Sequence, residues 1–173
     1  ARSGSQRERV STMTVLDRFN RAYRDACNGL RFTMAFAMPA DMAAGKAWYD
    51  TMGAWAVANG SAGWTAATSC FIFSAFSPRC TVAQNQARFV AFARTGHAVG
   101  LAEHLRSAIR VAAYGPDALT GRKRIAFGWA LAGDPNAVVI DSHSCKVCGI
   151  DADAPTKVQY DACERAHRDI APE

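Results

Sequence analysis

The fold is decided by the stretch Leu119–Ile150, LTGRKRIAFGWALAGDPNAVVIDSHSCKVCGI. It opens with Gly121, a helix breaker, followed by a cluster of basic residues and an apolar run that the tripeptide GDP closes. The next run, 137–140, has the composition of a buried segment and leads directly to Asp141 and His143. This order places an amine and a carboxylate on opposite sides of a compact pair of helices.

The composition predicts an all-α protein. At 173 residues the chain is long enough to bury a core without disulfide support. Apolar residues make up 50% of it, and no alternating valine or isoleucine runs indicate strands. We expect a flexible segment over residues 1–11 and a single-domain helical bundle over 12–173, with the hairpin and the site within 115–150.

The charge favours an anionic partner. The formal net charge is +5 and the isoelectric point is near 9.1, and each phosphate that Lys or Arg neutralises releases counterions. No apolar run approaches the roughly 18 residues that span a bilayer, and the first ten residues lack the apolar core of a signal peptide. We therefore expect a cytoplasmic protein with no membrane partner.

Periodicity and stop signals predict the helices. After Thr12 as an N-cap, apolar residues recur at helical spacing until Asn28-Gly29, which we expect to end the first helix, with 31–39 as a connection. Further helices are expected over about 40–58, 61–76 and 82–92, from 99 to 112, after Gly121, through Lys146, and from 158 to 170.

One of these helices has an apolar stripe that predicts which side is buried. The stripe consists of Val99, Ala102, Leu105, Ile109 and Ala112. The sequence places His104, Arg106 and Arg110 off the stripe, so we expect these three to face away from the core.

The deciding stretch resembles the core of the helix-hairpin-helix DNA glycosylases. Endonuclease III-like members of that family carry a glycine hairpin, then GRKTA, then VDTH. Here GRK at 121–123 and VIDSH at 139–143 stand in the same order, and Lys123 and Asp141 are 18 positions apart. The resemblance implies a helix-hairpin-helix glycosylase-like fold and double-stranded DNA as the partner.

A second match lies upstream, in FIFSAFSPRCTVAQNQARFV at 71–90. It is similar to the family's LSAQ-T-D-x-x-V-N-x-A segment, with Ser77, Thr81 and Asn85 in corresponding places. In that family the loop between the two helices probes the DNA stack, which implies DNA contacts from this segment. The alternative for Asn85 is an ordinary helix-surface amide.

An enzyme that acts on a DNA base must take that base out of the stack, which requires a grip on phosphate and a carboxylate or nucleophile in the pocket. Backbone N–H groups at a helix start hold phosphate without side chains. Asp141 would steady positive charge, deprotonate a nucleophile or orient an amine. The expected DNA contacts are Ser77, Arg79, Gln84, Asn85, Gly121, Arg122, Arg124 and Lys146. The expected catalytic residues are Asp141, Lys123 and His143, the last as a helix cap or an orienting group.

Two roles for Lys123 remain open. As in bifunctional glycosylases, it could attack the sugar as an amine, provided that desolvation or the neighbouring Arg122 and Arg124 lower its pKa. Alternatively it stays charged and holds phosphate. The second role needs no special environment, and we favour it.

The sequence differs from the helix-hairpin-helix glycosylases in ways that favour one functional hypothesis. Leu119 stands in the place of the hairpin's first glycine, no four-cysteine iron–sulfur run follows Asp141, and the chain is short. A small phage-encoded branch shares these features and is related to enzymes of thymine hypermodification, which displace pyrophosphate from an activated 5-methylene group in DNA. We therefore expect that chemistry in a phage-infected bacterial cell, with an amino acid or another amine as co-substrate and no cofactor. The alternatives are a DNA N-glycosylase, with or without lyase activity, and a non-catalytic DNA-binding protein.

The six cysteines are expected to be thiols packed in the core, because disulfide scaffolds belong to small secreted proteins. A competing hypothesis comes from their spacing. Cys145-x2-Cys148 followed by Cys163-x3-His167 has the ligand pattern of a structural zinc site. We expect no metal, and keep zinc as the alternative.

Overall fold

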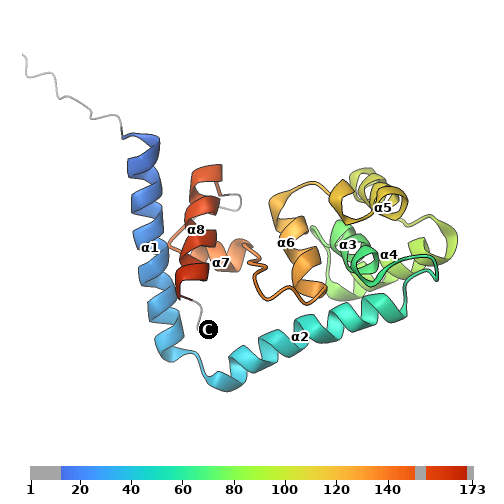
Figure 1. Ribbon diagram of the computed structural model, residues 1–173, viewed down its shortest axis with the longest axis horizontal. Coiled ribbons are helices and arrows are strands. Elements are labelled where there is room, and N and C mark those ends of the chain that lie inside the picture. The colour runs from blue at the N-terminus through green and yellow to red at the C-terminus, as the bar shows by residue number, and fades with distance from the viewer. Residues whose placement is uncertain (1–12, 151–154, 171–173) are drawn as a thin grey trace, which may run out of the picture. The chain divides into compact units, whose positions relative to one another are not determined.

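The computed structural model describes residues 13–150 and 155–170, and the regular structure in those ranges is entirely helical. The elements are α1 (Val15–Phe36), α2 (Pro39–Ala58), α3 (Ala66–Phe76), α4 (Val82–Thr95), α5 (Ala102–Tyr114), the 3-10 helix η1 (Pro116–Ala118), α6 (Arg122–Leu131), α7 (Ser142–Val147) and α8 (Lys157–Ile170) (Figure 1). The all-α prediction is confirmed for the described residues. The helix-hairpin-helix assignment stays a prediction, and the expected segment 1–11 lies outside the described residues.

The chain forms two compact units. Phe32–Asp141 make up one, and the parts that precede and follow this range make up the other. In the described part of the chain no helix has both the length and the apolar character that a membrane span requires.

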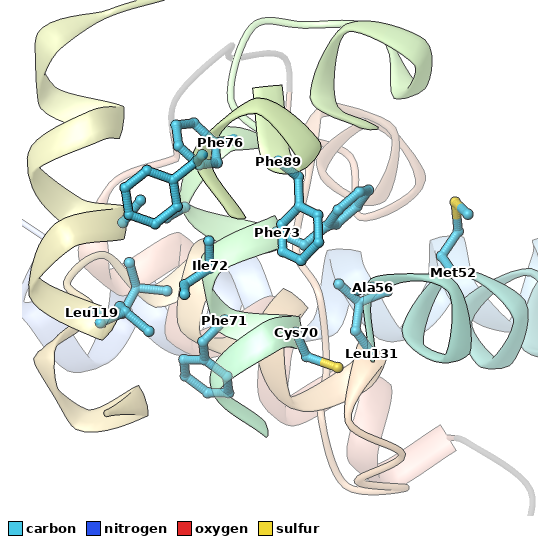
Figure 2. Packing of buried hydrophobic residues seen from close by; sticks show 14 residues of the cluster. Met52, Ala56, Cys70, Phe71, Ile72, Phe73, Phe76, Phe89, Leu119 and Leu131 are labelled. Atoms are coloured by element: carbon cyan, nitrogen blue, oxygen red, sulfur yellow. The ribbon is translucent and has the colours of Figure 1, made fainter. Parts of the chain in front are cut away.

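Helix α3 is the centre of the larger unit. All nine side chains from Thr68 to Phe76 are buried, and α3 contacts α2, α4, α5 and α6. Figure 2 shows that its phenylalanines meet side chains from several of these neighbours. Phe73, for example, packs its ring edge-on to Phe89 of α4 at 5.8 Å and to Trp55 of α2 at the same centroid distance. Aromatic pairs in this geometry add to the stability that burial provides.

Two close contacts fix α6 on α3. Gly128 lies so near the Phe71 ring that an added Cβ would fall 2.7 Å from it. Ser74 donates a 2.6 Å hydrogen bond from its hydroxyl to the carbonyl of Arg124. The first turn of α6, which carries the predicted phosphate-binding residues, is therefore held firmly on the core.

The first helix does not end where the sequence predicts. Asn28-Gly29 lies inside α1, and most of the expected connection 31–39 is helical, because α1 continues to Phe36. Gly29 has a packing role instead: a Cβ there would overlap the carbonyl of Val147 in α7. The glycine permits the two helices to approach within the smaller unit, so its effect is tertiary and not a local stop signal.

The predicted apolar stripe of α5 is only partly correct: Leu105 and Ala112 pack against the core, and Arg106 and Arg110 are exposed as expected. The buried residues are His104, Ala108 and Val111, whereas Ile109 is exposed. The spacing of positions 104, 108 and 111 places them on one helix face, and the spacing of the predicted set does the same. In an alanine-rich helix, periodicity alone could not choose between the two faces.

Candidate functional site

The hairpin segment leads the chain into α6 through two glycines with positive φ. Gly115 has φ 84° and Gly121 has φ 92°, a backbone region that side chains rarely adopt. Between them Leu119 is buried, so it anchors this segment in the core. No side chain caps the start of α6. Its first N–H groups therefore have no side-chain acceptor, and their predicted role in binding phosphate stays a prediction.

Helix α6 presents two faces with different surroundings. Lys123 and Phe127 are four residues apart and lie on one face. The ring of Phe127 packs against Trp48 at 6.3 Å and against Tyr49 at 6.0 Å, both from α2. Arg124, the next residue after Lys123, reaches toward α5 instead. Lys123 and Arg124 thus serve different surroundings, although the sequence groups them in one basic cluster.

Asp141 lies near the aromatic cluster formed by Trp48, Tyr49 and Phe127. It follows the buried Ile140, is itself half-buried, and stands just before α7, where an aspartate commonly caps a helix. Burial, followed by the nearby negative charge of Asp141, raises the pKa of Tyr49. A carboxylate, a phenol and the rings of Trp48 and Phe127 therefore gather in one region of the larger unit.

Lys123 is exposed at the start of α6. Its side chain shares a helix face with Phe127, which contacts Tyr49, which in turn lies within electrostatic range of Asp141. The joint role of Lys123 and Asp141 in one site stays a prediction. Arg122 is exposed as well.

His143 and Lys146 belong to a different compact unit. Both are exposed residues of α7, whereas Asp141 closes the larger unit. Their predicted roles as orienting group and DNA contact remain predictions.

The loop between α3 and α4 contains the predicted DNA-probing residues. Ser77 donates its hydroxyl to the carbonyl of Ser74 at 2.8 Å and thereby closes α3. Arg79 is exposed and has φ 55°, which makes it the non-glycine residue with positive φ in the described part of the chain. Such strain persists where a loop is held in a particular shape and is frequent at binding sites.

Gln84 and Asn85 serve the fold in different ways. Gln84 accepts a 3.0 Å hydrogen bond from the N–H of Thr81, and Thr81 accepts one in return, forming a capping box. Asn85 is buried and donates to the carbonyl of Phe73 at 3.2 Å, so the alternative of a surface amide is wrong. The side chain links α4 to α3, and its Oδ1 has no hydrogen-bond partner among the described residues.

The cysteines are all free thiols, and five are buried, as predicted for core residues. The four residues of the zinc hypothesis lie in one neighbourhood of the smaller unit. Cys148 hydrogen-bonds Cys163 and His167, bonds that lower the pKa of the Cys148 thiol. The Nδ1 of His167 lies 2.8 Å from the carbonyl of Cys163, and Cys145 lies within electrostatic range of Cys163. In the described part of the chain, however, no three such side chains are arranged to hold a metal ion.

Sequence reasoning missed some residues of these regions. The sequence predicts no site role for Trp48 or Tyr49; Trp48 is 40% exposed, and Tyr49 packs against the core. His104 was expected to face away from the core and is buried. The adjacent tryptophan and tyrosine were visible in the sequence, but nothing there indicated that Asp141 lies near them.

The fold and these contacts define an all-α protein with a half-buried carboxylate beside an aromatic cluster. The model of a family of unknown function, DUF7178, matches residues 31–173, and the chain belongs to this family. The match includes Trp48, Tyr49, α6 and Asp141. No curated protein and no solved structure matches the chain.

Proposed function

We propose that this protein binds double-stranded DNA and acts on a base turned out of the helix, with Asp141 as the reacting carboxylate. The observation that carries the proposal is the gathering of Asp141, Tyr49, Trp48 and Phe127. A flipped base is held by stacking on aromatic rings and is read by polar groups beside them. The exposed Trp48 would supply the ring, and Asp141, which lies within electrostatic range of the adjacent Tyr49, would supply the polar group.

The cations at the start of α6 fit the same substrate. Lys123 and Phe127 are separated by about 6 Å along the helix axis, which is roughly two base-pair steps of 3.4 Å. A phosphate held by Lys123, Arg122 and the uncapped N–H groups would then lie within about two nucleotides of a base on the aromatic cluster. This spacing supports one nucleic-acid strand that spans both regions.

Among reactions on a flipped base, we propose substitution at an activated 5-methylene group of thymine, in a phage-infected cell. An amine forms the new C–N bond while the C–O bond to pyrophosphate breaks. Asp141 accepts or orients the proton that the amine loses, and the cations of α6 neutralise the departing pyrophosphate. An amino acid or another amine would be the co-substrate.

The exposure of Lys123 favours its phosphate-binding role over the Schiff-base role. Burial would be needed to desolvate the ammonium group and make it a nucleophile. A glycosylase with lyase activity would give a covalent adduct with DNA on borohydride reduction. We expect no adduct, and an adduct that disappears in Lys123→Arg would replace the modification proposal with that alternative.

Base flipping can be tested with duplexes that carry 2-aminopurine, whose fluorescence rises when it leaves the stack. We expect the protein to raise the signal and Trp48→Leu to reduce it, because leucine keeps apolar volume but cannot stack on a base. Trp129→Leu is the matched control: Trp129 is 39% exposed but packs edge-on to Phe71. DNA binding with no change in fluorescence would favour a non-catalytic DNA-binding protein.

A further inference from the structure

The start of α5 lies within reach of the start of α6. Arg124, in the first turn of α6, contacts Glu103 of α5 with its Nη2 3.3 Å from the carboxylate oxygen, and its Nη1 donates to the hydroxyl of Ser107 at 3.2 Å. No side chain caps either helix, since neither Leu101 nor Gly121 provides a hydrogen bond. Arg124 thus links the N-termini of α5 and α6. Each of these N-termini carries a partial positive charge and backbone N–H groups that no side chain caps.

The charge around this junction is strongly unbalanced. Three guanidinium groups, those of Arg124, Arg88 and Arg79, lie within electrostatic range of His104, and among the described residues Glu103 is the carboxylate that opposes them there. The side chain of Glu103 is 68% exposed, whereas that of Arg124 is only 13% exposed. This carboxylate is therefore mostly in water, and a largely buried guanidinium faces it from the protein side.

Among the residues that the structure describes, Arg88 is held in place by groups other than carboxylates. It is half-buried in α4, hydrogen-bonds the thiol of Cys80, and passes so near Gly100 that an added Cβ there would lie 3.2 Å from its Nε. The loops on both sides of α4 thus position this guanidinium. A partly buried cation without a carboxylate partner is a common feature of anion sites, because planar guanidinium groups match phosphate geometry.

His104 gives an independent indication of a ligand. The residue is only 5% exposed, and its Nδ1 has no hydrogen-bond partner among the described residues. Burial, followed by the charges of Arg124, Arg88 and Arg79, lowers the pKa of His104, with Glu103 acting in the opposite direction. Buried polar atoms in folded proteins are nearly always paired. An anion among these cations would favour the protonated ring.

We propose that Arg88, Arg124 and His104, together with the start of α5, form a phosphate-binding site. It faces a different side of α6 from Lys123 and Phe127, so it is separate from the base-processing region. The proposal rests on the proposed function where it takes the phosphate to be one of the DNA backbone. A free phosphate or pyrophosphate has the same chemistry and is the other source to be distinguished.

The test measures duplex affinity by fluorescence anisotropy over a series of salt concentrations. Arg88→Gln and Arg124→Gln should each weaken binding and reduce the slope of log K against log salt by about 0.9, the value for one phosphate contact. Arg106→Gln and Arg110→Gln, which remove exposed arginines from the same helix as His104, are the matched controls. Equal slope changes in all four variants would overturn the site in favour of diffuse charge.

Glu103→Gln keeps the proposal testable if an arginine variant fails to fold. Removing the exposed carboxylate frees Arg124 for the ligand, so phosphate and DNA should bind several-fold more tightly. Unchanged or weaker binding by this variant would contradict the site.

The source of the phosphate is decided by following the ring protons of His104 by NMR. Inorganic phosphate, pyrophosphate and a short duplex are titrated separately. A rise in the pKa of His104 with any of them, absent in Arg88→Gln, supports the site, and a response to the free anions but not to the duplex assigns it to a free anion. If none of the three ligands changes the pKa of His104, the proposed phosphate-binding site is overturned. Asp141→Asn should leave these responses intact, so a failure of the base-processing proposal is distinguishable from a failure of this one.

Discussion

Two glycines in α2 should respond to alanine in opposite ways. A Cβ on Gly53 would lie 3.0 Å from the carbonyl carbon of Leu131 in α6 and closer still to its oxygen, whereas ordinary contacts begin at 3.4 Å. Because the obstacle is backbone, no side-chain rotation can relieve it, and α2 and α6 must move apart by about 1 Å or more. Overpacking of this kind costs about 1–3 kcal/mol, and we expect the upper end.

Gly45→Ala is the matched control in the same helix. Nothing lies within 4 Å of the position of its Cβ, so the change should stabilise the protein by about 0.5–1 kcal/mol through helix propensity alone. In thermal unfolding followed by circular dichroism, about 3 kcal/mol corresponds to a loss of roughly 6–12 °C in Tm for a chain of this size. Gly45→Ala should raise Tm by roughly 1–4 °C.

If Gly53→Ala unfolds at the same temperature as Gly45→Ala, the close contact between Gly53 of α2 and Leu131 of α6 is refuted. The result also bears on function, because α2 carries Trp48 and Tyr49 while α6 carries Phe127. Separating the two helices should reduce 2-aminopurine fluorescence in Gly53→Ala and leave it unchanged in Gly45→Ala.

Three further predictions concern single contacts. Gly29→Ala would place a Cβ against the carbonyl of Val147 and should destabilise the smaller unit by about 1–3 kcal/mol in urea unfolding; no loss would disprove that contact. Because the fold lowers the pKa of His104, the unfolded chain binds the extra proton as pH falls below about 6.5, so stability should fall from pH 7 to 5. The stability of the His104→Asn variant should fall less over this range. If the variant keeps the same dependence of stability on pH as the wild-type protein, the lowered pKa of His104 is disproved. Asn85→Ala should cost about 1–3 kcal/mol by removing the bond to the Phe73 carbonyl, while DNA affinity stays the same if its role is structural.

Local signals predicted much of the fold. The expected helix over 40–58 matches α2 to within one residue, and the helix expected over 82–92 begins at Val82 as predicted and ends a turn later than predicted, at a C-cap formed by Gly96 with φ 72°. These ends are decided by residues that act on their own backbone: Pro39 begins α2, Thr81 caps the start of α4, and Gly96 ends α4 by adopting positive φ. Such signals are readable in the sequence because they do not depend on distant partners.

The errors occurred where distant partners decide. Gly29 is a stop signal by local rules, but the close approach of α7 makes it an interior helix residue. His104 looked like a surface residue until α4 and α6 placed arginines around it, and Asn85 looked like a surface amide until α3 covered it. The same limit applies to the candidate site. The sequence could name Asp141 and Lys123, but only tertiary contacts place Tyr49 near the carboxylate and turn Arg124 away from it.

The central claim is that Asp141 takes part in chemistry on a DNA base. It is tested most directly by mass spectrometry of nucleosides from DNA incubated with the protein and candidate amines. The duplexes carry ordinary, hydroxymethyl or pyrophosphoryl-bearing thymine. The account predicts a new thymine derivative from the pyrophosphoryl substrate, much of it retained with Lys123→Arg, and a loss of about a hundredfold or more with Asp141→Asn. An undiminished yield from Asp141→Asn, or no altered nucleoside from any of these substrates with the wild-type protein, would contradict it.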